Sequence, residues 1–127
     1  MSIRLTTDQI ERYSRQIMVP DLGGKGQIRL RQSRVLVVGA GGLGSPAALY
    51  LAAAGIGTLG IIDPDQVELS NLQRQILHTT ADIGRPKVDS AKTKLGALNP
   101  DVQIDVYPVR LEDHNAAEII AGYNFVI

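Results

Sequence analysis

Residues 34–44 read RVLVVGAGGLG, an apolar β-branched run that passes directly into a glycine-rich loop. The run Arg34-Val35-Leu36-Val37-Val38 is typical of a strand buried on both faces of a parallel sheet. The loop Gly39-Ala40-Gly41-Gly42-Leu43-Gly44 satisfies the pattern G-x-G-x-x-G, and residues 43–54 predict a helix that ends at Gly55. This order predicts a phosphate site, because small residues let backbone amides approach phosphate oxygens at a helix N-terminus.

The composition is that of one folded domain. The chain has 127 residues, 44% of them hydrophobic, and its 13 basic and 13 acidic side chains cancel to a net charge of +0. No overall field therefore draws nucleic acid or a membrane surface to the protein. The absence of cysteine excludes disulfides, cysteine-bound metal and a thiolate nucleophile within the chain, and it fits a cytoplasmic protein.

Strands and helices alternate after the glycine loop. The apolar runs Thr58–Asp63 and Val102–Tyr107 predict strands, and Pro86 suits the first turn of a helix that continues to Leu98. A last helix near residues 115–121 precedes a fourth strand that includes Phe125–Ile127. We therefore expect an α/β fold, a Rossmann-like doubly wound and mainly parallel sheet. Because the chain ends on three apolar residues that read as part of a buried strand, we also expect it to be truncated.

The N-terminal residues predict a helical arm. The sequence Thr6-Thr7-Asp8-Gln9 reads as a capping box, and the helix after it is expected to continue to about Gln16. Pro20 and the glycine cluster at 23–26 are expected to break the helical region before a short helix over 27–32. We therefore divide the chain into an N-terminal helical arm, residues 1–32, and an incomplete nucleotide-binding half-domain, residues 33–127.

Polar and cationic side chains follow the second predicted strand. Asp63 ends that strand, where a carboxylate can accept both hydroxyls of a ribose, although it can also serve only to cap the turn at Pro64. The segment Ser70-Asn71-Leu72-Gln73-Arg74-Gln75 and the residue Lys87 add amide, guanidinium and ammonium donors. Donors of these kinds suit a triphosphate, whereas each one taken alone can be an ordinary solvated side chain.

Several motifs occur in a specific order in this chain: Arg12–Gln16, Gly39–Ser45, Asp63–Asp65 with Val67, Ser70–Gln75 and Gly84–Lys87. Together they resemble the ThiF/MoeB/HesA family, bacterial relatives of the ubiquitin-activating enzymes. The resemblance implies an adenylyltransferase that uses ATP and Mg²⁺ to activate the C-terminal glycine carboxylate of a ubiquitin-like sulfur-carrier protein, releasing pyrophosphate. It implies a cytoplasmic homodimer that acts in thiamine, molybdopterin or another biosynthesis, with no nucleic acid or membrane partner.

The resemblance also implies roles for individual residues. Arg15 is expected to reach across a homodimer into the partner's site, and Arg74 and Lys87 complete the predicted catalytic set. No residue of this chain is expected to bind metal, because the family's magnesium aspartate and its zinc-binding cysteine pairs are expected beyond residue 127. The predicted nucleotide-binding residues are Gly39, Gly41, Gly42, Gly44, Asp63, Ser70, Asn71, Leu72, Gln73, Arg74 and Lys87.

Two other functions fit parts of the sequence. An NAD-binding oxidoreductase would explain the glycine loop and Asp63, but it gives Arg15, Arg74 and Lys87 no task. A truncated module that dimerises without catalysis would fit the early end of the chain.

On the adenylyltransferase interpretation residues 1–127 alone are expected to be inactive. Neither histidine is required, because a carboxylate nucleophile needs no general base; His78, close to the Arg74 segment, is retained as a minor candidate.

Overall fold

The computed structural model describes residues 4–127, whose strands form one parallel sheet in the order β3-β2-β1-β4. The strands are β1 (Arg34–Val38), β2 (Thr58–Ile62), β3 (Gln103–Tyr107) and β4 (Phe125–Val126). All neighbouring pairs are parallel, so the carboxyl ends of the strands meet at one edge. The chain moves outward from β1 to β3 and then returns to place β4 on the other side of β1. In α/β sheets such a reversal opens a ligand-binding crevice beyond the carboxyl ends of the strands.

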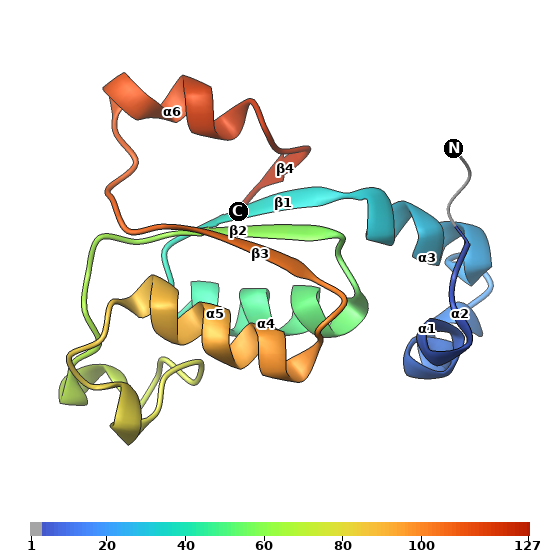
Figure 1. Ribbon diagram of the computed structural model, residues 1–127, viewed down its shortest axis with the longest axis horizontal. Helices are drawn as coiled ribbons and strands as arrows, with labels where there is room; N and C mark the ends of the chain where they lie inside the picture. Colours follow the sequence, from blue (N-terminus) through green and yellow to red (C-terminus); the bar gives the residue numbers. More distant parts are fainter. Residues whose placement is uncertain (1–3) are drawn as a thin grey trace.

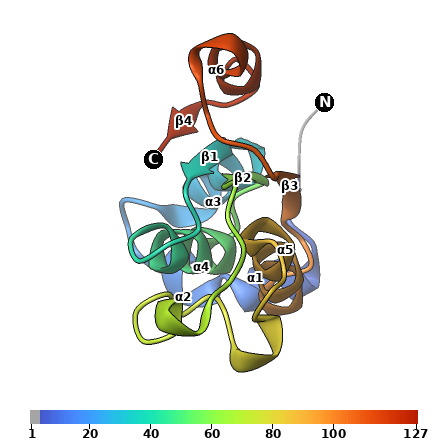
Figure 2. The same cartoon turned by 90° about the vertical axis from the view of Figure 1, so that its left-hand side faces the viewer.

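Helices lie on both faces of the sheet, which confirms the predicted doubly wound α/β fold. The helices are α1 (Thr7–Arg12), α2 (Ser14–Ile17), α3 (Gly23–Gln32), α4 (Gly44–Ala54), α5 (Lys87–Leu98) and α6 (Asp113–Ile120), with 3-10 turns η1 (Leu69–Asn71) and η2 (Thr80–Asp82). α4 and α5 lie along one face and α6 lies over the other, in both Figure 1 and Figure 2. Within residues 4–127 we find no helix with the length and apolar character needed to cross a membrane.

Local sequence signals set most boundaries as predicted. β1 has the predicted bounds, and α4 stops at Gly55, whose φ of 89° lies in the left-handed region that favours glycine. α5 begins directly after Pro86. At the start of α1 the capping box is present, with the Gln9 amide N–H donating to the Thr6 hydroxyl at 3.2 Å.

The N-terminal helices depart from the prediction because contacts with remote residues decide them. The first helix was expected to reach Gln16, but it ends at Arg12 and α2 begins after Tyr13. Tyr13 is 1% exposed, and its hydroxyl accepts a hydrogen bond from Asn99 Nδ2 at 2.8 Å. The predicted break is present at residues 18–22, which include Pro20. The glycine cluster, which was expected to be part of the break, instead forms the first turn of α3, where a β-carbon at Gly26 would lie 2.8 Å from the Leu22 side chain.

The segment before β1 packs against its own domain. Gln27, fully buried, donates through Nε2 to the carbonyl of Ala54 at 3.0 Å, at the end of α4. Arg31 donates to the carbonyl of Asp101 at 2.8 Å, just before β3. These contacts hold the segment at the amino ends of the strands (Figure 1). The division of the chain at residue 32 stays a prediction.

The main core lies between the sheet and the helices α4 and α5. β2 is buried at every position, and the side chains of α4 and α5 that face it are small or aliphatic. The edge strand β4 has a neighbour only on its β1 side. For this reason Phe125–Ile127 are exposed, as expected of the edge of an incomplete sheet. The buried core comprises Val35, Val37, Ala40, Ala48, Ala52, Ile56, Leu59, Ile61, Leu77, Val88, Ala91, Leu95, Val102 and Ile104.

Asp82 fixes the connection between β2 and α5. Its buried carboxylate accepts from the Thr79 amide N–H and hydroxyl, each at 2.8 Å, and from Arg85 at 3.0 Å. Lys94 of α5 also pairs with it. Burial by itself would raise the pKa of Asp82, but hydrogen bonds from Lys94 and Thr79 outweigh burial and hold the pKa well below its usual range. The carboxylate therefore anchors the connection to α5 while it stays ionised.

Replacing Gly44 by alanine should destabilise the protein, whereas the same change at Gly96 should stabilise it. A β-carbon at Gly44 would overlap the carbonyl oxygen of Gly39, and one at Gly96 of α5 would meet nothing within 4 Å. In urea unfolding of the protein at its natural length, we expect Gly44→Ala to cost about 1–3 kcal/mol through overpacking. Gly96→Ala should add about 0.5–1 kcal/mol through helix propensity. Equal effects at the two sites would contradict the tight contact at Gly44.

Replacing Asp82 by asparagine should cost about 1–3 kcal/mol at pH 7, because the ion pairs with Lys94 and Arg85 are lost. The folded-state pKa of Asp82 is lowered, so its stabilisation is complete above the unfolded pKa of about 4 and is lost as the pH falls below it. The difference between wild type and variant should therefore shrink from pH 5 to pH 3 in urea titrations. A difference that is constant over this range would contradict the assignment, and exposed Asp21→Asn is the control.

Candidate functional site

The glycine loop at the carboxyl end of β1 is held open by hydrogen bonds at its two ends. Gly39 has a φ of 97°, and its N–H donates to the Ile62 carbonyl at 2.8 Å. At the other end the Ser45 N–H donates to the Gly41 carbonyl at 2.9 Å as α4 begins. Within residues 4–127 no hydrogen bond uses the N–H groups of residues 41–43. The loop therefore presents unpaired backbone donors at the N-terminus of a helix, the arrangement that binds anions.

Asp63 joins the ends of β1 and β2. Its carboxylate is 7% exposed and accepts from the Ala40 N–H and the Asp65 N–H, both at 2.8 Å, one on each oxygen. Asp63 therefore caps the turn at Pro64, which is the role given above as the alternative to ribose binding. Because each carboxylate oxygen has a second lone pair, the group can still accept hydrogen bonds from a ligand's hydroxyls.

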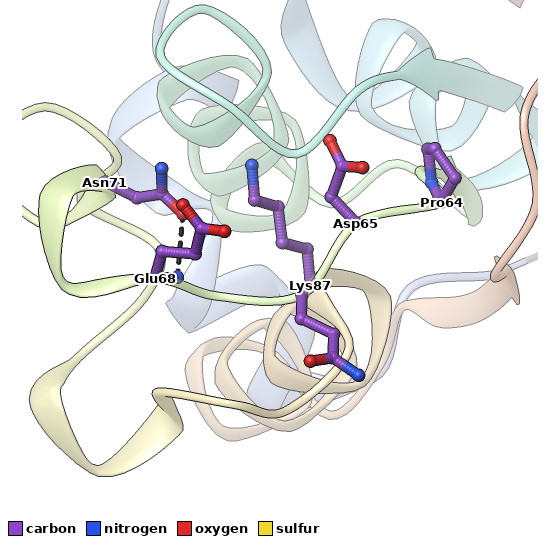
Figure 3. A pocket seen from close by; sticks show the side chains of 6 residues that line it. Pro64, Asp65, Glu68, Asn71 and Lys87 are labelled. Atoms are coloured by element: carbon purple, nitrogen blue, oxygen red, sulfur yellow. Dashed lines mark hydrogen bonds between the residues drawn. The ribbon is translucent and has the colours of Figure 1, made fainter.

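A pocket of about 520 Å³ opens beside this turn. Lys87 is only 7% exposed and extends in the same direction as Asp65, whereas Asn71 enters the pocket from the side (Figure 3). The Lys87 backbone N–H donates to the Asp65 carbonyl at 2.9 Å, which ties the start of α5 to the turn. The Asn71 Oδ1 accepts from the Glu68 N–H at 2.8 Å, so its amide nitrogen remains available to a ligand. The lining residues are Pro64, Asp65, Gln66, Glu68, Asn71 and Lys87.

Arg74 lies against the glycine loop. Its side-chain carbons are 3.9 Å from the position that a β-carbon of Gly42 would occupy, and its Nη1 donates to the Ser70 carbonyl at 3.0 Å. The guanidinium is otherwise exposed, so most of its five donors are open to a ligand. The fold thus brings Arg74 to the glycines, although more than 30 residues of chain separate them.

Other predicted site residues lie elsewhere. Ser70, Leu72 and Gln73 do not line the pocket, although Ser70 supports Arg74 through its carbonyl. Arg15 lies on α2, at the end of the molecule opposite the carboxyl ends of the strands (Figure 1). It is exposed, and in the part of the chain that the structure describes it has no acidic partner.

Two buried residues beside the loop were not predicted as site residues. Gln75 is 4% exposed, and its Oε1 has no hydrogen-bond partner among the described residues. Its amide nitrogen lies 3.7 Å from the position of a Gly41 β-carbon, so the side chain faces the loop. His78, which had been retained only as a minor candidate, contacts the Ala40 carbonyl through Nε2 at 2.8 Å. The sequence signal for Gln75 was its place directly after Arg74; nothing in the sequence marked His78 as a loop contact.

A metal centre is not formed by these residues. Within residues 4–127, no group of three or more His, Asp or Glu side chains is placed to hold a metal ion. The donors at the site are backbone N–H groups, amides and cations, and its acceptors are the carboxylates of Asp63, Asp65 and Glu68. This combination suits a ligand that carries both negative charge and hydroxyl groups.

Comparison with known proteins identifies relatives of this chain. A sulfur carrier protein adenylyltransferase of Thermus thermophilus is 50% identical over 125 residues, which cover 98% of this chain and 46% of that protein. The adenylyltransferase and sulfurtransferase MOCS3 of Arabidopsis thaliana is 53% identical over 123 residues, 97% of this chain and 26% of that protein. The chain thus spans less than half the length of these relatives.

A solved structure has the same fold. The tRNA N6-threonylcarbamoyladenosine dehydratase TcdA of E. coli, crystallised with ATP, is 28% identical with a TM-score of 0.91, over 98% of this chain and 51% of that one. The family model described as the ThiF family matches residues 13–127. The resemblance found in the sequence is thereby confirmed, and the chain belongs to the ThiF family.

Proposed function

We propose that the protein containing this chain is an ATP-dependent adenylyltransferase that activates the C-terminal glycine carboxylate of a ubiquitin-like sulfur carrier. The observation that carries the proposal is the open glycine loop with Arg74 against it, next to the pocket that Asn71 and Lys87 line. Asp63 ties this loop to the turn at which the pocket opens. The relatives at about 50% identity are named for sulfur-carrier adenylylation, whereas the tRNA dehydratase is 28% identical. The difference in identity favours a carrier protein as the substrate.

The site offers each part of ATP a chemically suitable group. Asp63 can accept the ribose hydroxyls, and the partnerless Oε1 of Gln75 provides another acceptor beside the loop. The N–H groups at residues 41–43 and the positive end of the α4 dipole suit the phosphates. Lys87 and Arg74 supply the counter-charge, and Asn71 donates without charge.

The chemistry requires little of the protein beyond orientation and charge. A carboxylate oxygen of the carrier forms a bond to the α-phosphorus, and the bond from that phosphorus to the bridging oxygen of pyrophosphate breaks. The nucleophile is already ionised, so no side chain needs to remove a proton. Arg74 and Lys87 stabilise the charge that grows on the departing pyrophosphate. Mg²⁺ is expected to accompany ATP, but residues 4–127 form no cluster that could hold it, so we assign no metal ligand among them.

An NAD-dependent oxidoreductase would use the same glycine loop and Asp63. It would leave Lys87 without a task, and Lys87 is a nearly buried cation directed along a polar pocket. Keeping an ammonium in such a position is costly unless an anionic ligand compensates it. Lys87 therefore favours the nucleotide with the larger negative charge.

The complete protein should bind Mg-ATP in preference to NAD, and Lys87→Ala should damage ATP chemistry selectively. Loss of this charged donor is expected to cost about 2–4 kcal/mol of transition-state stabilisation in ATP–pyrophosphate exchange. Asp63→Ala should weaken both nucleotides, because both contain a ribose, and so it serves as the control. Competition binding decides between the functions: if NAD bound at least as tightly as Mg-ATP, the adenylyltransferase proposal would be wrong.

Arg15 should complete the site of a partner subunit in a homodimer. It lies on α2, far from the glycine loop of its own chain, which supports a role in a second copy over a role in its own site. Arg15→Ala and Lys87→Ala homodimers should each be inactive, and mixing them with subunit exchange should restore about one quarter of wild-type activity, because half the dimers regain one intact site. No recovery after exchange has been demonstrated by mass spectrometry would contradict action in trans.

A further inference from the structure

His78 is buried between the glycine loop and α5, and the proposed ATP contacts do not use it. The side chain is 4% exposed and lies on the segment between η1 and η2. Its Nε2 is 2.8 Å from the Ala40 carbonyl of the loop, and its Nδ1 is 2.8 Å from the Ser90 hydroxyl of α5. The imidazole thus joins three parts of the site that are distant in sequence.

The two hydrogen bonds assign the tautomer of the ring. A carbonyl oxygen only accepts, so Nε2 must carry a proton and donate to Ala40. In the neutral ring Nδ1 is then unprotonated and accepts from the Ser90 hydroxyl. Burial, together with the nearby charge of Lys87, lowers the pKa of His78, which favours this neutral form despite its hydrogen bond to Ala40. The ring is therefore a fixed donor to the loop.

The Ala40 carbonyl controls the direction of a backbone donor. Its peptide group is planar, so the Gly41 N–H points opposite to the Ala40 C=O. His78 holds that oxygen toward the interior, and Asp63 holds the Ala40 N–H at 2.8 Å. The ends of the loop are tied through the Gly39 N–H and the Gly41 carbonyl, and between them Ala40 is held through both its N–H and its carbonyl. The Ser45 hydroxyl also donates to the Ala40 carbonyl, at the longer distance of 3.4 Å.

We propose that His78 is a positioning residue: by holding the Ala40 carbonyl through Nε2–H, it directs the Gly41 N–H at the nucleotide phosphates, and Ser90 keeps it in the required tautomer. The inference rests on the proposed function, since it needs a phosphate ligand at the loop. On this proposal His78 contacts no substrate and acts on the nucleotide through the backbone of the glycine loop.

Two conservative variants of His78 test its two hydrogen bonds separately, because each variant keeps only one of them. Glutamine places an amide nitrogen near the position of Nε2 and keeps the bond to Ala40, whereas asparagine places one near Nδ1 and keeps only the bond to Ser90. In the protein at its natural length, His78→Asn should raise the Kd for Mg-ATP about tenfold, or 1.4 kcal/mol, while His78→Gln should stay within about threefold of wild type. The matched control is His114→Asn, because the His114 side chain is 73% exposed and remote from the loop. Thermal unfolding checks that each variant is folded.

The tautomer of the ring is measured without replacing His78. In ¹⁵N NMR of the wild-type protein His78 should show a protonated Nε2 and an unprotonated Nδ1 at pH 7, and Ser90→Ala should add the other tautomer. A wild-type His78 protonated at Nδ1 alone would overturn the inference, as would equal ATP affinities for the asparagine and glutamine variants. Failure of the wild type to bind Mg-ATP would instead overturn the proposed function.

Discussion

The hydrogen bond between the Asp63 carboxylate and the Ala40 N–H is the contact around which the site is organised. It joins the carboxyl ends of β1 and β2 where both strands stop, and it is buried. A loop rich in glycine loses more conformational freedom on folding than any other segment of this length, so it needs restraints from outside. Asp63 supplies one of them, and the carboxylate's other oxygen orders the turn that leads to the pocket.

The connection from β2 to α5 gives the loop its chemical surroundings. It carries Arg74 and Gln75 to the glycines, places Asn71 in the neighbouring pocket and then delivers Lys87 to the first turn of α5. A long connection without regular strands needs internal ties, and the buried carboxylate of Asp82 provides them through Thr79, Arg85 and Lys94. The charged groups of this connection therefore serve two purposes. The ion pairs of Asp82 hold the connection in place, whereas Arg74 and Lys87 remain available to a ligand.

A second polar cluster fixes the N-terminal helices. Asn99 donates to the Tyr13 hydroxyl and to the Ala52 carbonyl, each at 2.8 Å, so the end of α5, the end of α4 and the start of the chain meet at one amide. Gln27 and Arg31 satisfy further carbonyls at the end of α4 and before β3. The α2 helix, with the exposed Arg15, is therefore held on a rigid base at the end of the molecule away from the glycine loop.

Local signals in the sequence determined the regular elements and the chemical nature of the site. The β-branched run of β1, the glycine that ends α4 and the proline before α5 act through the conformations of their own residues, so no remote contact was needed to find them. The glycine pattern, Asp63 and Lys87 were predicted as site residues from their place after the strands and from the family resemblance, and their roles stay predictions. Tertiary contacts alone decided the break at Tyr13, the burial of Gln75 against the glycine loop and the place of His78 against Ala40. Each of these depends on a residue from a distant part of the chain, and burial and hydrogen-bond satisfaction at such contacts outweigh local preference.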